Sequence, residues 1–266
     1  MLVAVQTLGN RPPLFFVHGL HGIMPLRPSL AAVLGPDQPF FIIHANGIDG
    51  RRPVIDNIRD MVLAYIDEIQ AARPTGPLFV ASMCAGSLAA IEIARELRQR
   101  GREIGPVILA DPPLVPLGHK KRQHAVDPDQ PQVAQHLYQD VRRALMALAS
   151  LPYNDMPFNP GDPDQLHHCT LAGIGSLIAL TRHAPAPFSG PAELIVSAER
   201  AAGFFHPEMP WCKLLPGPRM VHVLPWSHEE LFWSGRMHVA RMIKFMLEQE
   251  APVLQSLDGQ KEPLPE

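Results

Sequence analysis

An α/β fold built on a mostly parallel sheet is predicted by three features of the sequence. Short continuous apolar runs, typical of buried strands, alternate with longer segments of helical periodicity. Gly, Pro and Asn residues separate these segments and mark the connections. The alternation resumes near the C-terminus after one interruption. Strands that alternate with helices in this way form a parallel sheet with helices on both faces.

The first half of the chain supplies four of the expected strands. A run at 14–17 follows Pro12-Pro13 and ends at His18-Gly19, and a second run at 40–43 is closed by Asn46-Gly47. Apolar residues at helical spacing predict a helix from about 55 to 72. Further expected elements follow in order: a strand that begins at 78, a helix at 88–97 that Gly101 stops, and a strand at 107–110.

The second half is less regular. From about 114 to 190 the chain is polar and Pro-rich, with two helical patches at 133–151 and 166–183. Strands are expected again at 192–196 and 220–224, and a last helix at about 235–249. We therefore predict a core formed by residues 1–113 and 191–250, an inserted helical lid at 114–190, and a polar flexible tail at 251–266.

Composition narrows the class of protein. The 266 residues are 46% hydrophobic and 18% charged, enough for one sizeable core, and the formal net charge of −3 favours neither nucleic acid nor an anionic membrane as partner. Three widely spaced cysteines are not a disulfide framework and suit a reducing compartment. No apolar run approaches the roughly 20 residues of a membrane span, and the apolar start is too short for a signal peptide. We expect a cytoplasmic protein.

The most informative stretch is the turn after the strand that begins at 78. It reads Ser82-x-Cys84-x-Gly86, close to the G-x-S-x-G pattern of a nucleophile elbow, in which a strained strand-to-helix turn presents a reactive side chain. A thiol stands where the hydroxyl is expected. A helix N-terminus and a neighbouring imidazolium both stabilise a thiolate, so Cys84 is the predicted nucleophile. The alternative is a small buried cysteine that only packs.

Two more residues follow predicted strands in the order that a catalytic triad of this kind requires. Asp111 ends the strand at 107–110 and precedes two prolines, and His228 lies in the loop after the strand at 220–224. Because the carboxyl ends of parallel strands share one edge of the sheet, we expect both to meet Cys84 there. His228 would be the general base and Asp111 would orient it, although Asp111 could instead cap a turn.

Glycines after the first strong strand point to an oxyanion hole. In His18-Gly19-Leu20-His21-Gly22 they let the backbone turn, so that an amide faces the developing negative charge. The backbone N–H groups of Leu20 and Ala85 are the candidates.

Other candidates carry less weight. His167-His168-Cys169 resembles a metal-ligand run, but adjacent side chains diverge, so we expect no metal. Lys120-Lys121-Arg122 fits a solvated loop better than a docking patch, Ser82 is expected to replace the first elbow glycine in packing, and His222 is expected to be structural.

The stretch from Leu14 to Asp111 resembles the thioesterase domains that release products from non-ribosomal peptide synthetases and polyketide synthases, members of the α/β-hydrolase superfamily. The similarity is carried by Leu14-Phe15-Phe16-Val17-His18-Gly19, the elbow with its helix, and Val107-Ile108-Leu109-Ala110-Asp111, with Ser-His-Glu-Glu-Leu around His228 similar to the terminal His loop. The sequence departs from the family pattern at Ser82 and at Cys84. Cysteine at this position is similar to a minority of these domains, associated with closure of strained lactone or lactam rings.

The resemblance implies an α/β-hydrolase fold with a mobile helical lid, no bound cofactor, and a substrate attached to the phosphopantetheine arm of an acyl or peptidyl carrier protein, a transient partner. The enzyme would release an acyl or peptidyl chain through a Cys84 acyl-enzyme, by hydrolysis or by intramolecular cyclisation. Two alternatives remain open: a cysteine-dependent esterase or lactone hydrolase of small molecules, and a non-catalytic module that binds an acyl carrier.

Overall fold

The sheet that organises this protein has seven strands within the part of the chain that the computed structural model describes, residues 1–114, 131–151, 156–205 and 210–258. The strand order is β1-β3-β2-β4-β5-β6-β7. Only β1 runs antiparallel to its neighbour, and all the other pairs are parallel. The fold predicted from the sequence is therefore confirmed. The bounds of the strands are β1 Leu2–Gln6, β2 Leu14–Val17, β3 Phe40–Ile43, β4 Phe79–Met83, β5 Val107–Ala110, β6 Ala192–Ser197 and β7 Arg219–Leu224.

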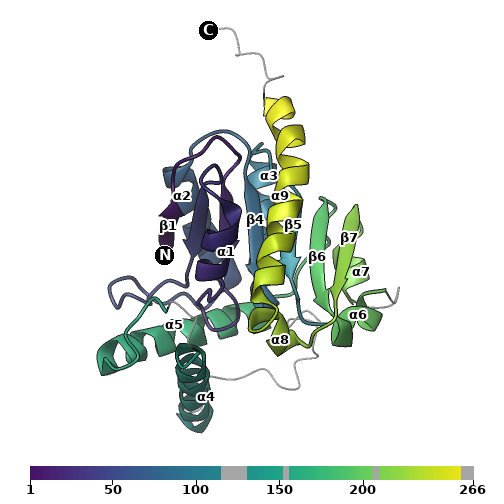
Figure 1. Ribbon diagram of the computed structural model, residues 1–266. Coiled ribbons are helices and arrows are strands. Elements are labelled where there is room, and N and C mark those ends of the chain that lie inside the picture. Colours follow the sequence, from purple (N-terminus) through teal and green to yellow (C-terminus); the bar gives the residue numbers. More distant parts are fainter. Residues whose placement is uncertain (115–130, 152–155, 206–209, 259–266) are drawn as a thin grey trace.

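Helices cover both faces of the sheet (Figure 1). Helix α1 (Arg27–Leu34) packs with α9 (Arg236–Asp258) on one face, and α2 (Ile58–Ala72) packs with α3 (Ser87–Gln99) on the other. Two longer helices, α4 (Pro131–Ala149) and α5 (Pro163–Arg182), lie between β5 and β6 in the chain and near the carboxyl ends of the parallel strands. Short helices complete the second half: α6 Ala198–Phe205, α7 Pro210–Leu214 and α8 His228–Phe232.

The central strands show why continuous apolar runs mark this kind of sheet. All four side chains of β2 are fully buried. Phe15 and Val17 join the apolar cluster under α2 and α3, whereas Leu14 and Phe16 join the cluster under α1 and α9. Side chains of a strand point alternately to the two faces, so a strand covered on both sides must be apolar at every position.

Several boundaries differ from the sequence prediction for local reasons. Helix α2 begins at Ile58, because the Asn57 side chain accepts a hydrogen bond from the Asp60 N–H (2.9 Å) and caps the helix. Helix α9 continues to Asp258 through Pro252, although a frayed tail was predicted from 251. The side chains of Ala251 and Leu254 are buried against the rest of the protein, which stabilises this last part of the helix.

Two further observations bear on the predictions. Strand β1, which the sequence analysis did not predict, pairs with β3 at the edge of the sheet. Among the described residues, no helix is both long and apolar enough to cross a membrane.

Candidate active site

A sharp turn carries the predicted nucleophile. Strand β4 ends at Met83, a single turn of 3₁₀ helix spans Cys84–Gly86, and α3 begins at Ser87. Cys84 adopts a φ of 51°, in the left-handed region that side chains other than glycine rarely occupy. A Cβ atom at Gly86 would lie 1.9 Å from the carbonyl oxygen of His18, so only glycine allows strand β2 and this turn to approach so closely. The strained elbow is therefore present.

Ser82 does not compete as a nucleophile. It lies within β4, its side chain is fully buried, and its hydroxyl donates a hydrogen bond to the Ser87 hydroxyl (3.3 Å). The side chain links the strand to the start of α3, in agreement with a packing role.

Asp111 is the most firmly held member of the predicted triad. It follows β5 with a φ of 48°, and its side chain is fully buried. The Ser197 N–H donates to Oδ1 (2.6 Å), and the Arg200 guanidinium lies 3.1 Å from Oδ2 and donates to the Asp111 carbonyl oxygen (2.8 Å). A buried carboxylate needs such partners to offset the loss of water, and these contacts fix its direction.

His228 connects Asp111 with Cys84. The sequence analysis placed His228 in a loop, but it is the first residue of α8. Ser227 and Glu230 form a capping box that starts a helix there. Its Nδ1–H donates to Asp111 Oδ2 at 2.5 Å. The ring of Phe232 packs edge-on against the imidazole. The orientation of His228 is thus fixed by both the carboxylate and an aromatic neighbour.

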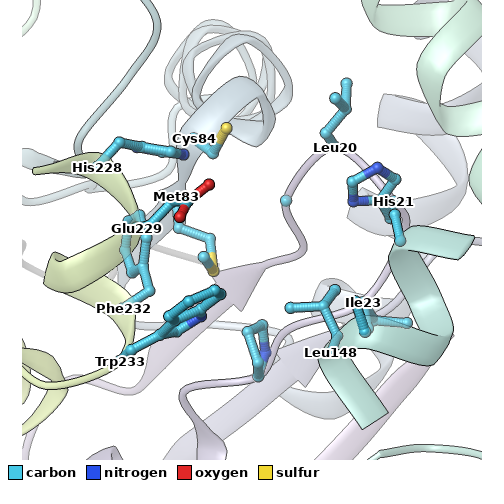
Figure 2. Close-up of a pocket in the computed structure, with 14 residues that line it drawn as sticks. Leu20, His21, Ile23, Met83, Cys84, Leu148, His228, Glu229, Phe232 and Trp233 are labelled. Carbon is cyan, nitrogen blue, oxygen red and sulfur yellow. The ribbon is translucent and has the colours of Figure 1, made fainter. Parts of the chain in front are cut away.

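The pKa of His228 reflects these contacts. Burial alone would lower it, but hydrogen bonds with Asp111 and with Cys84 outweigh burial and raise the pKa to about 9. Figure 2 shows Cys84 and His228 side by side at the edge of a cavity. An imidazolium beside a thiol favours the thiolate, which is the reactive form of cysteine.

The two predicted oxyanion donors lie close to Cys84. The Ala85 N–H belongs to the first turn after β4, where helical N–H groups lack partners, and Leu20 follows the β2 strand in a turn held by the Gly19 N–H bond to the Ile23 carbonyl (3.1 Å). In Figure 2 Leu20 and His228 lie on opposite sides of Cys84. This placement is compatible with an oxyanion hole, whose assignment to these two amides remains a prediction.

The turn after β2 has a buried support. His18 is fully buried, and its two ring nitrogens contact the Tyr65 hydroxyl (2.6 Å) and the Gly19 carbonyl (2.7 Å). Burial lowers the pKa of His18 to about 4, so the ring is neutral and acts as a structural hydrogen-bonding group. The contact connects α2 to the backbone that carries Leu20.

A cavity of about 400 Å³ opens beside Cys84 and His228. Its walls are mostly apolar, and they come from the turn after β2, from the elbow, from α4 and from α8 (Figure 2). The lining residues are Gly19, Leu20, His21, Ile23, Pro25, Met83, Cys84, Ala144, Ala147, Leu148, His228, Glu229, Phe232 and Trp233. Such a cavity suits a largely apolar ligand.

The three residues of the predicted triad lie together as expected, but sequence reasoning did not predict their surroundings. It missed Arg200 and the Ser197 N–H, which hold Asp111, and the apolar wall that Phe232 and Trp233 form. Arg200 follows β6 at the same edge of the sheet as the triad, and this position was the only signal that could have indicated it.

His222 and His167-His168-Cys169 do not line this cavity. His222 contacts the Glu193 carboxylate (2.7 Å) on neighbouring strands, in agreement with a structural role. In the described ranges, no cluster of three or more metal-ligating side chains occurs, at His167-His168-Cys169 or elsewhere. Residues 120–122 lie outside the described ranges.

The fold and the site together define an α/β-hydrolase with a cysteine at the nucleophile position. Residues 12–155, more than half of the chain, match the family model described as "Thioesterase domain". The chain belongs to this family of enzymes, which act on thioester bonds.

Similar proteins include synthetases far longer than this chain. The chain is 32% identical over 111 residues to malpibaldin synthetase of Mortierella alpina, and 32% identical over 105 residues to the nonribosomal peptide synthetase btyA of Aspergillus terreus. These matches cover 42% and 40% of this chain, but only 2% and 11% of those proteins. The chain thus corresponds to a small part of the curated relatives.

Solved structures share the fold. The NocB thioesterase domain, in covalent complex with a fluorophosphonate nocardicin G analog, matches with a TM-score of 0.67 at 21% identity, over 92% of this chain and 99% of that one. The Vlm2 thioesterase domain with bound dodecadepsipeptide matches with a TM-score of 0.68 at 16% identity, over 91% and 97%. At these identities the likeness concerns the fold alone.

Proposed function

We propose that this protein releases an acyl or peptidyl chain from the phosphopantetheine thioester of a carrier protein through a covalent Cys84 acyl-enzyme. One observation supports this most directly: His228 is held by Asp111 at 2.5 Å and contacts Cys84, which stands on a strained elbow beside an apolar cavity. The family and the synthetase relatives support a carrier-bound thioester as substrate.

In the first step the Cys84 sulfur attacks the carbonyl carbon of the thioester. The attacking form is a pair in which His228 already holds the proton of the thiol, and Asp111 stabilises this imidazolium. The negative charge that develops on the carbonyl oxygen faces the N–H groups of Leu20 and Ala85. The bond to the pantetheine sulfur then breaks, and His228 returns the proton to this leaving group. The acyl chain is now linked to Cys84.

Sulfur changes the energetics of this intermediate. Transfer from one thiol to another exchanges one thioester for another, so the acyl group stays as activated as it was on the carrier. A serine ester would lose much of this activation. The preserved thioester can drive attack by a weak intramolecular nucleophile, especially an amine, as well as by water that His228 activates. We therefore propose release by cyclisation or by hydrolysis, with the acceptor depending on how much water enters the cavity.

The segment between β5 and β6 has the position of a lid. Helix α4 contributes Ala144, Ala147 and Leu148 to the cavity wall, on the side that faces α8. A helix that forms one wall of the cavity from an inserted segment can control the entry of the acyl chain and of water. We assign this role to residues 114–190.

A mass-spectrometric assay tests the proposal. The protein is incubated with octanoyl-pantetheine, and we expect an octanoyl adduct on Cys84 together with free pantetheine and a released acid. In Cys84→Ala the adduct should disappear and the release rate should fall by at least about 10³-fold. Cys212→Ala is the matched control, because Cys212 is also partly exposed but does not line the cavity.

Two further arms separate the alternatives. Methyl octanoate is tested as an oxoester substrate beside octanoyl-pantetheine. Faster turnover of the oxoester than of the thioester would identify a small-molecule esterase. In Cys84→Ser we expect hydrolysis of octanoyl-pantetheine to persist but to be slow, since the serine ester is less activated than the thioester. Release that is unchanged in Cys84→Ala would contradict the acyl-enzyme.

A further inference from the structure

One charged side chain faces the cavity beside the reactive residues. Glu229 follows His228 in α8, and Figure 2 shows its carboxylate directed into the cavity toward Cys84 and Met83. The other titratable groups of the lining are accounted for: Cys84 and His228 belong to the triad, and burial lowers the pKa of His21, which keeps that ring neutral. The cavity is otherwise apolar.

The neighbouring glutamates show that Glu229 has no evident structural task. Glu230 closes the capping box with Ser227, and Glu199 accepts a hydrogen bond from the His228 N–H (3.2 Å). Both carboxylates are used to hold the turn that presents His228. Within the described residues, the Glu229 carboxylate has neither a hydrogen bond nor a salt bridge. Glu229 is an exposed residue, so water solvates its carboxylate, which is available to pair with a charged ligand that enters the cavity.

We infer that Glu229 determines specificity by binding an ammonium group on the acyl chain, close to the thioester carbonyl. The substrate class is then a mostly apolar acyl group with a basic amine near the reacting carbon. This inference rests on the proposed function, which places the acyl group in the cavity. The position of the amine follows from the chain: Glu229 adjoins His228, so its carboxylate reaches only the part of the acyl group next to Cys84.

The charges nearby leave this role open to Glu229. The Asp111 carboxylate faces both His228 and Arg200 and does not line the cavity. Glu229 therefore contributes the charge that an ammonium group meets inside the cavity. In an apolar pocket, a small number of polar groups usually fixes the orientation of the ligand. Here the ion pair would orient the carbonyl toward Cys84.

Binding of two matched probes tests the inference independently of turnover. The probes are the pantetheine amides of α-aminooctanoate and of α-methyloctanoate, which differ only by an ammonium in place of a methyl group and cannot be cleaved as thioesters. Calorimetry is done at about pH 6.5, below the usual pKa of an α-amino group. We expect the amino probe to bind about fivefold more tightly, a modest factor because the carboxylate keeps contact with water.

Variants assign the preference to one side chain. Glu229→Gln should abolish the fivefold difference, and Glu229→Lys should reverse it in favour of a third probe that carries an α-carboxylate. Glu248→Gln, which removes a surface carboxylate outside the cavity, should retain it. Equal binding of the amino and methyl probes to the wild type, or an unchanged preference in Glu229→Gln, would overturn the inference.

The corresponding thioesters separate this inference from the proposed function. If the amino preference is seen with the amides but no thioester acylates Cys84, the substrate class stands and the acyl-enzyme fails. If Cys84 is acylated but no preference is seen in either assay, the acyl-enzyme stands and the role of Glu229 fails.

Discussion

The two sides of the His228 ring differ in how firmly their partners are held. On one side Asp111 is fully buried and is held by the Ser197 N–H, by Arg200 and by His228 itself. On the other side Cys84 is partly exposed and opens into a cavity. Both residues adopt a positive φ at the end of neighbouring strands, so the backbone geometry is alike and only the surroundings differ.

The difference separates two tasks. The closed side fixes the tautomer and the direction of the imidazole, which must not change during the reaction. The open side must admit a substrate and allow the sulfur to form and break bonds, so it cannot be filled by protein atoms. The variants below alter one side at a time, from the largest expected effect to the smallest.

Asp111→Asn should have the largest effect. The amide preserves the shape of the side chain but removes its charge, so the imidazolium loses its partner and the ring can adopt the wrong tautomer. We expect the rate of Cys84 acylation by octanoyl-pantetheine to fall by about 10³-fold. Circular dichroism checks that the fold is retained. A loss of less than tenfold would show that Cys84 reacts without help from the closed side.

Gly86→Ala tests the backbone that both sides share. An added Cβ would collide with the His18 carbonyl, and no flexible side chain is there to move aside. We expect the free energy of unfolding to fall by about 3 kcal/mol, measured by urea denaturation. Gly161→Ala is the matched control, since its Cβ would only approach the end of the Asn159 side chain. Equal stability of the two variants would contradict the close approach.

The free energy of unfolding should depend on pH through His228, whose two partners are Asp111 and Cys84. Its pKa of about 9 in the folded protein lies above the ordinary value of 6.5, so the folded state holds the proton more tightly. Binding of this proton stabilises the folded state, and the stabilisation is fully present below pH 6.5 and is lost as the pH rises through about 9. It should amount to about 3 kcal/mol, and His228→Gln should lack it.

Single variants then show how much of this pH-dependent stabilisation comes from the Asp111 side and how much from the Cys84 side of His228. Asp111→Asn and Cys84→Ala should each reduce the difference in stability between pH 6.5 and pH 9, since hydrogen bonds with both residues raise the pKa of His228. Urea denaturation across the pH range measures each contribution. A larger change in Cys84→Ala would mean that the open side dominates.

Sequence reasoning predicted the closed framework better than the open cavity. The strands at 14–17, 40–43 and 107–110 are recognisable because both faces of the sheet are covered, which requires apolar residues throughout. Cys84, Asp111 and His228 were placed because each follows a strand at one edge of the sheet. These features depend on local pattern and on topology, both of which are present in the sequence.

Features that depend on how distant segments pack were not predictable. The edge strand β1 needs β3 as its partner, and α9 continues past Pro252 only because Ala251 and Leu254 find a buried surface. The direction of the Glu229 side chain depends on α8, a helix of five residues that its capping box determines. Short helices carry too little periodicity to be recognised in sequence.

Arg200→Met should have the smallest effect and tests the outer layer of the closed side. Arg200 donates to the Asp111 carbonyl and pairs with its carboxylate, and its charge lowers the pKa of His228. Without it the acylation rate should fall about fivefold and the pKa of His228, followed by NMR, should rise. Arg200→Lys retains the charge and should keep the pKa of His228 close to its wild-type value. A pKa that falls in Arg200→Met would show that Arg200 acts by holding Asp111 in place and not through its charge.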